Sequence, residues 1–276
     1  MKFADLHLHT EYSDSTYTPE ELISAAEGAG LSCVAVVDHD NASGITPCLE
    51  AAKGKAVEVL SGIELTAAYN GLEIHFLGYL IDHTNHELLK KMEFLKDYRV
   101  ERIYKITEKL RGLGLEIDAQ DVFDIGGLGT VGRLHIARAM VKKGLIPATA
   151  VAFKKYIGDK CPAYVCGFRL NPKEAIDLIR GVGGVPVLAH PYTLGNDELI
   201  TEFVKVGLMG LEVYYPEHSK SMTEKYLKLA KAHDLLVSGG SDCHGKAKPK
   251  VKIGSVKIDY SLVEKIKAAK EKACAK

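Results

Sequence analysis

Residues 3–9 read FADLHLH, an apolar strand pattern that carries two histidines, His7 and His9, one residue apart. Side chains at positions i and i+2 of a β-strand project from the same face, so both imidazoles point the same way. Two imidazoles on one rigid strand supply half of a metal site. A pair with this spacing also occurs by chance, so the rest of the chain has to decide whether it binds metal.

Short apolar runs and helical patterns alternate on both sides of a central stretch. The apolar runs predict strands at 3–8, 33–37, 57–63, 74–81, 185–189, 211–215 and 235–238. Helical patterns predict helices at about 19–28, 172–180, 198–206 and 221–233. Alternation on this scale predicts an α/β fold in which helices lie outside a parallel sheet. A chain of 276 residues can form one large barrel or one domain with an insertion.

The strand signal disappears between about residues 83 and 158. Apolar residues there form one helical stripe, which consists of Leu88, Met92, Leu95, Ile103, Ile106, Leu110 and Leu113. We therefore predict a helical cap at 82–158, inserted into a barrel that is made of residues 1–81 and 159–276.

Metal-ligating side chains recur in and after the predicted strands. The candidates are His7, His9, Asp14, His39, Glu64, His75, His190, Asp242 and His244. The C-terminal ends of barrel strands meet at one face, where functional groups belong. Imidazole and carboxylate ligands without thiolate suit Zn, Mn or Fe(II), and these candidates are too many for one ion. Any one of them alone is better explained as a core histidine or a turn residue, but their recurrence favours a metal centre.

These residues lie in motifs that resemble those of the PHP (polymerase and histidinol phosphatase) superfamily, in the same order along the chain. The motifs are His7-Leu8-His9, Asp14, Val37-Asp38-His39-Asp40, Gly62-Ile63-Glu64, His75, Ala189-His190-Pro191 and Gly240-Ser241-Asp242-Cys243-His244. The resemblance is closest to the stand-alone PHP phosphoesterases that act on nucleoside monophosphates and 3',5'-bisphosphates. It implies a distorted (β/α)7 barrel, similar to a TIM barrel, with two or three metal ions at the C-terminal face.

The resemblance also implies which residues hold each ion. One ion would be held by His7, His9, Glu64 and Asp242, a second by Glu64, His75 and His190, and a third by Asp14, His39 and His244. Glu64 would bridge the first two ions, and Glu64, His190 and Asp242 would be catalytic. Some PHP proteins have histidine where this chain has Asp14, and the carboxylate favours manganese or iron over zinc. We therefore expect two to three divalent ions, with manganese preferred.

Two arginines of the predicted cap are candidates for substrate binding. Arg99 and Arg102 lie within or beside the apolar stripe of its long helix, where a charged side chain needs a partner. They either form structural ion pairs, with their stems covering apolar surface, or bind a phosphate. In the nucleotide phosphatases that the chain resembles, arginines of this insertion bind substrate, and this favours the second interpretation.

A glycine-rich turn lies further along the cap. Residues 126–138 read GGLGTVGRLHIAR, and Thr130 is a plausible N-cap of the helix that follows. Backbone N–H groups at such a turn can bind an anion, although most glycine-rich turns bind nothing. The run resembles an insertion motif of the nucleotide-acting PHP group, which makes Arg133 and His135 candidates for phosphate contacts.

The predicted function is that of a hydrolase, a phosphatase that cleaves the phosphomonoester of AMP or 3',5'-nucleoside bisphosphates by attack of a metal-bridging hydroxide. The enzymatic alternatives are a 5'-to-3' exoribonuclease on short 5'-phosphorylated oligonucleotides, a histidinol phosphatase and an amidohydrolase barrel. The remaining alternative is an inactive PHP binding module. Inactive versions lose ligands, whereas all the candidates are present in this chain.

The composition limits the partners. Lys plus Arg and Asp plus Glu both number 36, so the chain lacks the basic field of a protein that binds long nucleic acid. A small phosphorylated substrate, a nucleotide or a short oligonucleotide, remains compatible with this balance. No apolar run is long enough to suggest membrane insertion. The six cysteines show no paired spacing, as expected of a cytoplasmic protein with reduced thiols.

Overall fold

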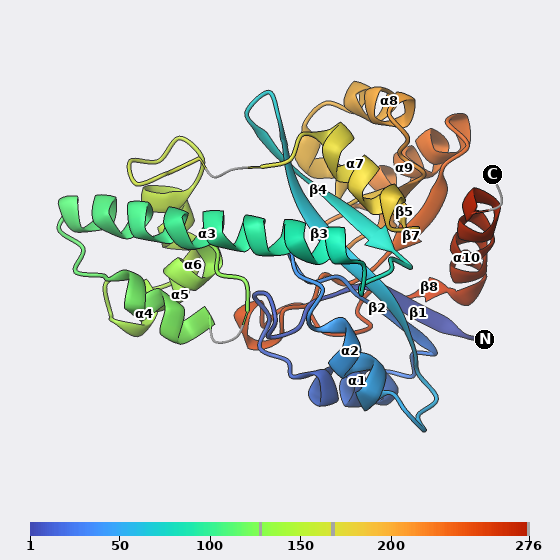
Figure 1. Ribbon diagram of the computed structural model, residues 1–276, viewed down its shortest axis with the longest axis horizontal. Coiled ribbons are helices and arrows are strands. Elements are labelled where there is room, and N and C mark those ends of the chain that lie inside the picture. The colour runs from blue at the N-terminus through green and yellow to red at the C-terminus, as the bar shows by residue number, and fades with distance from the viewer. Residues whose placement is uncertain (127–128, 167–168, 275–276) are drawn as a thin grey trace.

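An eight-stranded sheet forms the body of the protein (Figure 1). The computed structural model describes residues 1–126, 129–166 and 169–274. The strands are β1 (Phe3–Leu8), β2 (Cys33–Val36), β3 (Glu58–Tyr69), β4 (Leu72–Tyr79), β5 (Val185–Leu188), β6 (Gly210–Tyr214), β7 (Leu236–Gly239) and β8 (Ile258–Asp259). They follow the spatial order β7-β6-β5-β4-β3-β2-β1-β8.

The sheet curls until the segment after β7 meets β1. Cys243 forms a parallel bridge with Leu8, and the backbone N–H of Asp242 donates to the carbonyl of His7 at 2.8 Å. This contact nearly closes the barrel, which confirms the predicted fold class. It also brings the C-terminal ligand candidates beside the first strand.

One hairpin departs from the parallel arrangement. Strand β4 runs antiparallel to both β3 and β5, so the prediction of a parallel sheet is wrong here. The predicted strand ended at Ile63, whereas β3 continues to Tyr69 and turns at Asn70 and Gly71, whose φ angles are 50° and 81°. Glu64 therefore lies inside a strand and not after one. Thr66 pairs with His75, so Glu64, two residues before Thr66, shares a face with His75.

Helices cover the outside of the barrel (Figure 1). They are α1 (Pro19–Gly28), α2 (Ile45–Ala51), α7 (Pro172–Gly181), α8 (Glu198–Lys205), α9 (Lys220–Ala232) and α10 (Tyr260–Cys274). The start of α1 matches its sequence signature. Thr18 Oγ1 accepts from the Glu21 N–H at 3.2 Å, and Glu21 Oε2 accepts from the Thr18 N–H at 3.1 Å.

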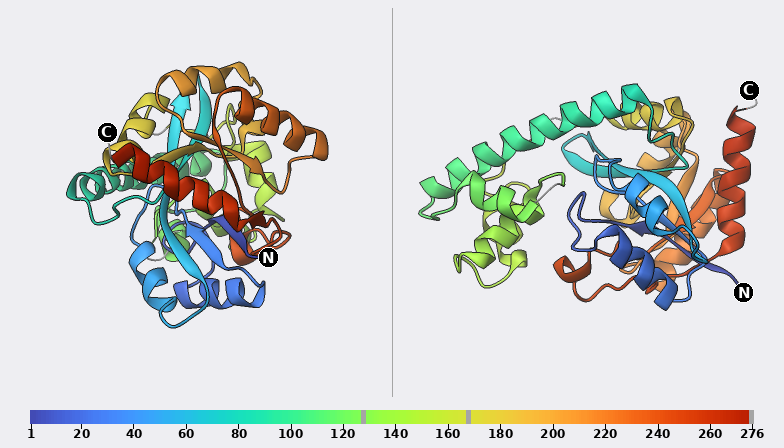
Figure 2. Two further views of the ribbon diagram at one scale, coloured as in Figure 1. Left: turned by 90° about the vertical axis from the view of Figure 1, so that its right-hand side faces the viewer. Right: turned by 60° about the horizontal axis from the view of Figure 1, so that its bottom comes forward.

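The remaining helices stand to one side of the barrel (Figure 2). They are α3 (His86–Gly112), α4 (Ala119–Gly126), α5 (Arg133–Lys142), α6 (Thr149–Ala152) and a π-helical turn, η1 (Phe153–Ile157). In the described part of the central stretch there is no strand between residues 83 and 158, as predicted. Apolar side chains of this region, among them Ile103, Met140 and Ala163, form a separate cluster, whereas Leu88, Met92 and Leu95 of α3 pack into the barrel core.

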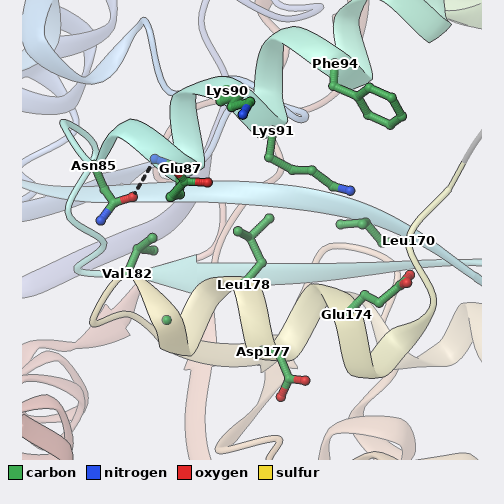
Figure 3. A pocket seen from close by; sticks show the side chains of 11 residues that line it. Asn85, Glu87, Lys90, Lys91, Phe94, Leu170, Glu174, Asp177, Leu178 and Val182 are labelled. Carbon is green, nitrogen blue, oxygen red and sulfur yellow. Dashed lines mark hydrogen bonds between the residues drawn. The ribbon is translucent and has the colours of Figure 1, made fainter.

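A groove lies between the first half of α3 and α7 (Figure 3). Its volume is about 760 Å³, and Leu170, Leu178 and Val182 line its floor. Asn85 stands at one end, where its side chain accepts hydrogen bonds from the N–H groups of Glu87 and Leu88 and caps α3. The nine candidate ligands, all within the described ranges, lie elsewhere.

Candidate metal centre

All nine candidate ligands lie together at one end of the barrel. His7 and His9 come from β1 and its end, Asp14 and His39 from the loops after β1 and β2, and Glu64 and His75 from the β3–β4 hairpin. His190 follows β5, and Asp242 and His244 follow β7. The barrel therefore places side chains from six separate segments within contact distance of one another.

The first group surrounds one oxygen of Glu64. Its Oε2 atom lies 3.2 Å from Nε2 of both His7 and His9. Asp242 Oδ1 lies 3.1 Å from His9 Nε2 and 3.5 Å from His7 Nε2. Two imidazole nitrogens and two carboxylate oxygens thus face one small volume, a donor set that suits a divalent ion.

The other oxygen of Glu64 faces a second group. Its Oε1 atom lies 2.8 Å from His75 Nδ1 and 3.1 Å from His190 Nε2. His39 also approaches this group, since its Nδ1 atom is 3.3 Å from Glu64 Oε2. Glu64 is the point where two sets of imidazoles meet.

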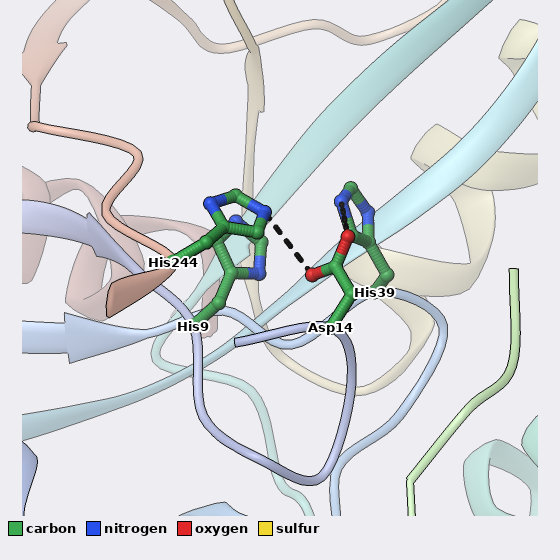
Figure 4. A group of neighbouring side chains, drawn as sticks. All are labelled: His9, Asp14, His39 and His244. Carbon is green, nitrogen blue, oxygen red and sulfur yellow. Dashed lines mark ion pairs between the residues drawn. The ribbon is translucent and has the colours of Figure 1, made fainter. Parts of the chain in front are cut away.

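The third group contains Asp14 and three histidines (Figure 4). Asp14 Oδ1 is 3.1 Å from His244 Nε2, and Asp14 Oδ2 is 3.9 Å from His39 Nε2. The ring of His9 lies between them, with its centroid 4.7 Å from that of His39 and 4.3 Å from that of His244. Ligand atoms of all four residues fall within 4.8 Å of one another.

Burial and charge act against each other in this cluster. Burial alone would lower the pKa of His9, but the carboxylates of Asp242 and Glu64 beside its Nε2 atom raise it to about 9. For His39 burial prevails, and its pKa falls to about 3. Burial would raise the pKa of Glu64, yet the charges of His39 and His7 hold it well below its usual range. The cluster therefore combines ionised carboxylates with tightly packed imidazoles.

Several buried ligand atoms of the cluster lack a hydrogen bond within the described residues. These atoms are Nδ1 and Nε2 of His9, Oδ1 of Asp14, Nδ1 of His39 and Nδ1 of His190. Buried polar atoms are normally satisfied, and leaving one unpaired costs roughly 1–3 kcal/mol. Divalent cations would satisfy those that face the shared volumes, so the donor set fits a metal centre.

The backbone is strained at the same place. His190 has φ 28° and Asp242 has φ 53°, and both lie in the left-handed region that side chains other than glycine rarely adopt. Such strain costs on the order of 1–3 kcal/mol per residue and persists where surrounding structure fixes it. The strain directs both side chains toward Glu64 and His9.

Sequence patterns did not identify the residues that orient the ligands. Glu212 Oε1 accepts from His7 Nδ1 at 2.8 Å, and Glu212 Oε2 accepts from the His190 N–H at 2.7 Å. Tyr215 Oη and Lys248 Nζ both donate to Asp242 Oδ2, at 2.8 and 2.9 Å. Glu212 lies within a predicted buried strand, and a buried carboxylate needs a partner. This was the one signal in the sequence that pointed to its role.

The predicted arginines of the cap reach the barrel beside His75. Arg133 Nη2 is 3.0 Å from Glu73 Oε2, and Arg169, which sequence patterns also missed, pairs with the same carboxylate. Glu73 Oε1 in turn lies 3.3 Å from His75 Nε2. Arg133 and Arg169 are thus linked to a candidate ligand through one carboxylate.

Arg99 and Arg102 differ in how fully they are paired. Arg99 pairs with Asp40, and its Nη2 atom donates to Thr66 Oγ1 at 3.0 Å. Arg102 Nε donates to the carbonyl of Val165 at 2.7 Å, but its Nη2 atom is buried without a hydrogen bond among the described residues.

The charges around Arg102 also indicate an excess of positive charge. Burial and the charges of Arg133 and Arg169 lower the pKa of Arg102 to about 10. Three guanidinium groups therefore lie near two carboxylates, Glu73 and Asp159, the second of which pairs with Arg133 at 2.7 Å, and this leaves a net positive charge at the edge of the site.

The glycine-rich turn differs from its prediction. The N-cap of α5 is Gly132 and not Thr130, whose N–H donates to the carbonyl of Tyr12 at 3.0 Å. His135 Nδ1 accepts from the Gly132 N–H at 3.1 Å, and burial lowers the pKa of this histidine to about 4. Both N–H groups are therefore used within the protein. Gly127 and Leu128 of this run lie outside the described residues.

The residues around the centre also bound an open cavity of about 160 Å³. Its lining includes five candidate ligands together with Thr193, Tyr215 and Lys248. In the described part of the chain, no helix is long and apolar enough to cross a membrane.

Comparison with known proteins gives a consistent set of relatives. The family model described as PHP domain matches residues 5–120. The chain is 32% identical to a 5'-3' exoribonuclease of Haemophilus influenzae, over 87% of this chain and 89% of the relative. It is 30% identical to a 3',5'-nucleoside bisphosphate phosphatase of Chromobacterium violaceum, over 88% of each chain. A crystal structure from Bifidobacterium adolescentis, described as a metal-dependent phosphoesterase, superimposes with a TM-score of 0.88 at 33% identity and covers 95% of this chain and 94% of its own.

Proposed function

The chain belongs to the PHP family, and from that premise we propose that it is a metal-dependent phosphoesterase that hydrolyses the phosphomonoester of nucleotides such as AMP or adenosine 3',5'-bisphosphate. The observation that carries the proposal is the position of Glu64, whose two oxygens face two separate sets of imidazoles. The relative named as a nucleoside bisphosphate phosphatase supports the substrate class.

The geometry supports a definite assignment of ligands. His7, His9, Glu64 and Asp242 would hold one ion, and Glu64, His75 and His190 a second. Asp14, His39 and His244 would hold a third, with His9 close to it. The carboxylate of Asp14 at the third position favours manganese, with iron or zinc as alternatives.

Divalent ions in such a site polarise phosphate oxygens and supply a nucleophilic water at neutral pH. The protein's own contribution is to hold the ligands in place. Glu212 fixes the ring of His7 and the backbone of His190, while Tyr215 and Lys248 hold one oxygen of Asp242. Lys248 uses one N–H on Asp242, which leaves donors for phosphate oxygens that enter the cavity.

The cap would bind a phosphate that is not cleaved. Arg102 carries a buried donor that has no hydrogen-bond partner among the described residues, and Arg133 and Arg169 lie close enough to lower its pKa. A phosphate placed there would satisfy that donor and offset the charge repulsion among the three guanidinium groups. A substrate with two phosphates, one at each position, fits this arrangement.

The same arrangement also fits a second candidate, a 5'-to-3' exoribonuclease acting on short 5'-phosphorylated RNA. Cations beside the metal centre could read the 5'-phosphate while the next phosphodiester lies over Glu64. The relative from Haemophilus influenzae that carries this name supports the alternative.

Phosphate release from the manganese-loaded protein tests these proposals. The substrates are AMP, adenosine 3',5'-bisphosphate, histidinol phosphate and a 5'-phosphorylated RNA trimer. We expect AMP or the bisphosphate to be cleaved best, and a preference for the trimer with stepwise release of mononucleotides would indicate the exoribonuclease. A preference for histidinol phosphate would reject the nucleotide assignment. Retained metal without turnover of any substrate would indicate a binding module.

A further inference from the structure

An exposed tyrosine stands beside the residues that line the cavity of the metal centre. Tyr192 belongs to the 3₁₀ turn η2 (Pro191–Leu194), which follows His190 directly. Thr193 of the same turn lines the cavity. The Tyr192 side chain is 36% exposed, although the flanking Pro191 and Leu194 are buried. The turn is therefore anchored at both ends, and it presents one ring to solvent.

Other aromatic rings fix the orientation of Tyr192. Its ring centroid lies 5.8 Å from that of Tyr215, at an interplanar angle of 34°, and 5.5 Å from that of His218, at 87°. The Nδ1 atom of His218 donates to the carbonyl of Val213 at 2.8 Å, which fixes this ring in turn. Together Tyr192, Tyr215 and His218 form an aromatic wall.

The wall continues into the metal centre. The Tyr215 ring lies 5.5 Å from that of His190, and its hydroxyl donates to Asp242. Among the described residues, the hydroxyl of Tyr192 has no hydrogen-bond partner, so no such contact explains why the ring is held here.

We infer that Tyr192 and the wall behind it form a stacking subsite for a flat ring, the nucleobase of the substrate. The inference rests on the proposed function, since a phosphate at Glu64 would bring the rest of the molecule past Tyr192. Aromatic side chains stack on any base, so the subsite should favour nucleotides over sugar phosphates without selecting one base.

The chain contains no tryptophan, which allows a direct binding measurement. Tyr192→Trp introduces a single indole, whose fluorescence falls when a base stacks on it. The probes are the phosphonate analogue of AMP, whose P–C bond resists hydrolysis, and ribose 5-phosphate, which lacks the base. The control is Tyr104→Trp, on the exposed face of α3, where Tyr104 packs edge-on against Phe123.

We expect the AMP analogue, but not ribose 5-phosphate, to quench the indole at position 192, and neither to affect the control. Quenching by both probes, or by neither, would overturn the inference. Quenching by the analogue in a protein that hydrolyses no phosphomonoester would support the subsite while rejecting the proposed reaction, so the two failures remain distinct.

Turnover gives an independent check. Tyr192→Ala should lower kcat/KM for AMP roughly tenfold and change that for ribose 5-phosphate less than about twofold, whereas Tyr192→Phe should keep both values. An equal loss with both substrates would mean that Tyr192 only supports the turn, and it would overturn the stacking role.

Discussion

Oε1 of Glu212 lies 2.8 Å from Nδ1 of His7, and both side chains are fully buried. The carboxylate accepts the Nδ1–H, so the lone pair of His7 is on Nε2, which faces Glu64 and Asp242. The other oxygen of Glu212 holds the backbone of His190. One buried carboxylate thus orients two candidate ligands from different strands.

Replacing Glu212 by glutamine should weaken metal binding roughly 10–100-fold, because an amide cannot accept both hydrogen bonds. Titration of the metal-free protein with manganese measures the change. Glu202→Gln is the matched control, since Glu202 is a carboxylate at the surface that accepts a hydrogen bond from Tyr69 at 2.8 Å. Unchanged manganese affinity in the Glu212 variant would show that the carboxylate does not tune the site.

Glu64→Gln should lower kcat by orders of magnitude, since a neutral amide cannot serve two ions with two anionic oxygens. Metal analysis of the purified variant should show fewer ions per chain than the wild type. Near wild-type turnover with metal retained would disprove the bridging role.

Incubation of the wild type with a chelator should likewise abolish turnover, and added manganese should restore it.

Lys248→Met should raise KM for AMP roughly tenfold, because the substrate loses a charged hydrogen-bond donor. The Lys248 side chain is 41% exposed, and it reaches Asp242 across the cavity mouth. Lys252→Met, at an exposed position nearby, provides the control. Lys248 could act by binding the substrate phosphate or by holding Asp242, and steady-state kinetics with metal content measured in parallel separate these two roles. A loss of metal with KM unchanged would mean that Lys248 only holds Asp242.

Arg102→Met should lower kcat/KM for adenosine 3',5'-bisphosphate about tenfold and leave AMP within about twofold, because only the bisphosphate carries a second phosphate. Arg111→Met, on the same helix, removes an arginine that pairs with Asp118 at the surface. An equal loss of kcat/KM for both substrates would mean that Arg102 binds the phosphate that is cleaved.

The buried His135 should make stability depend on pH. Its folded pKa of about 4 is below the value of about 6.5 expected in the unfolded chain. The unfolded state therefore binds more protons between these values, and stability is lost as pH falls from 6.5 toward 4. By pH 5 the loss is about 2 kcal/mol.

His135→Gln removes this dependence, because glutamine at the same position can still accept from the Gly132 N–H. Denaturant unfolding of both proteins in chelator, at pH 8 and pH 5, measures it. Between pH 8 and pH 5, the free energy of unfolding of the wild type should fall by about 2 kcal/mol more than that of the variant. If the free energy of unfolding changed equally with pH in the two proteins, His135 would not be the cause of the pH dependence.

Local patterns were enough to predict part of the architecture. The histidine pair of β1 follows from strand alternation, and the start of α1 from its capping signature, because both depend on neighbours in sequence. Residues such as His190 and Asp242 follow short buried strands, so their grouping could be expected from the geometry of a barrel.

Other features depend on contacts between distant segments. The apolar run that ended at Ile63 did not show that β3 continues, and the Asn70-Gly71 turn of the hairpin was overlooked. Arg169 had no motif around it, and only its approach to Glu73 gives it a role. The pairing of Glu212 with His7 joins residues 205 positions apart, which no sequence window contains.

Helix α3 has a consequence for how the molecule unfolds. Its first half completes the apolar core of the barrel with Leu88, Met92 and Leu95, and its second half completes that of the cap with Ile103, Ile106 and Leu110. Starting a helix is unfavourable, whereas extending an existing one is not. Each half of α3 is therefore stabilised by the other half. Barrel and cap should therefore melt in a single cooperative transition, and a cap excised from the chain should not persist as an autonomous folding unit.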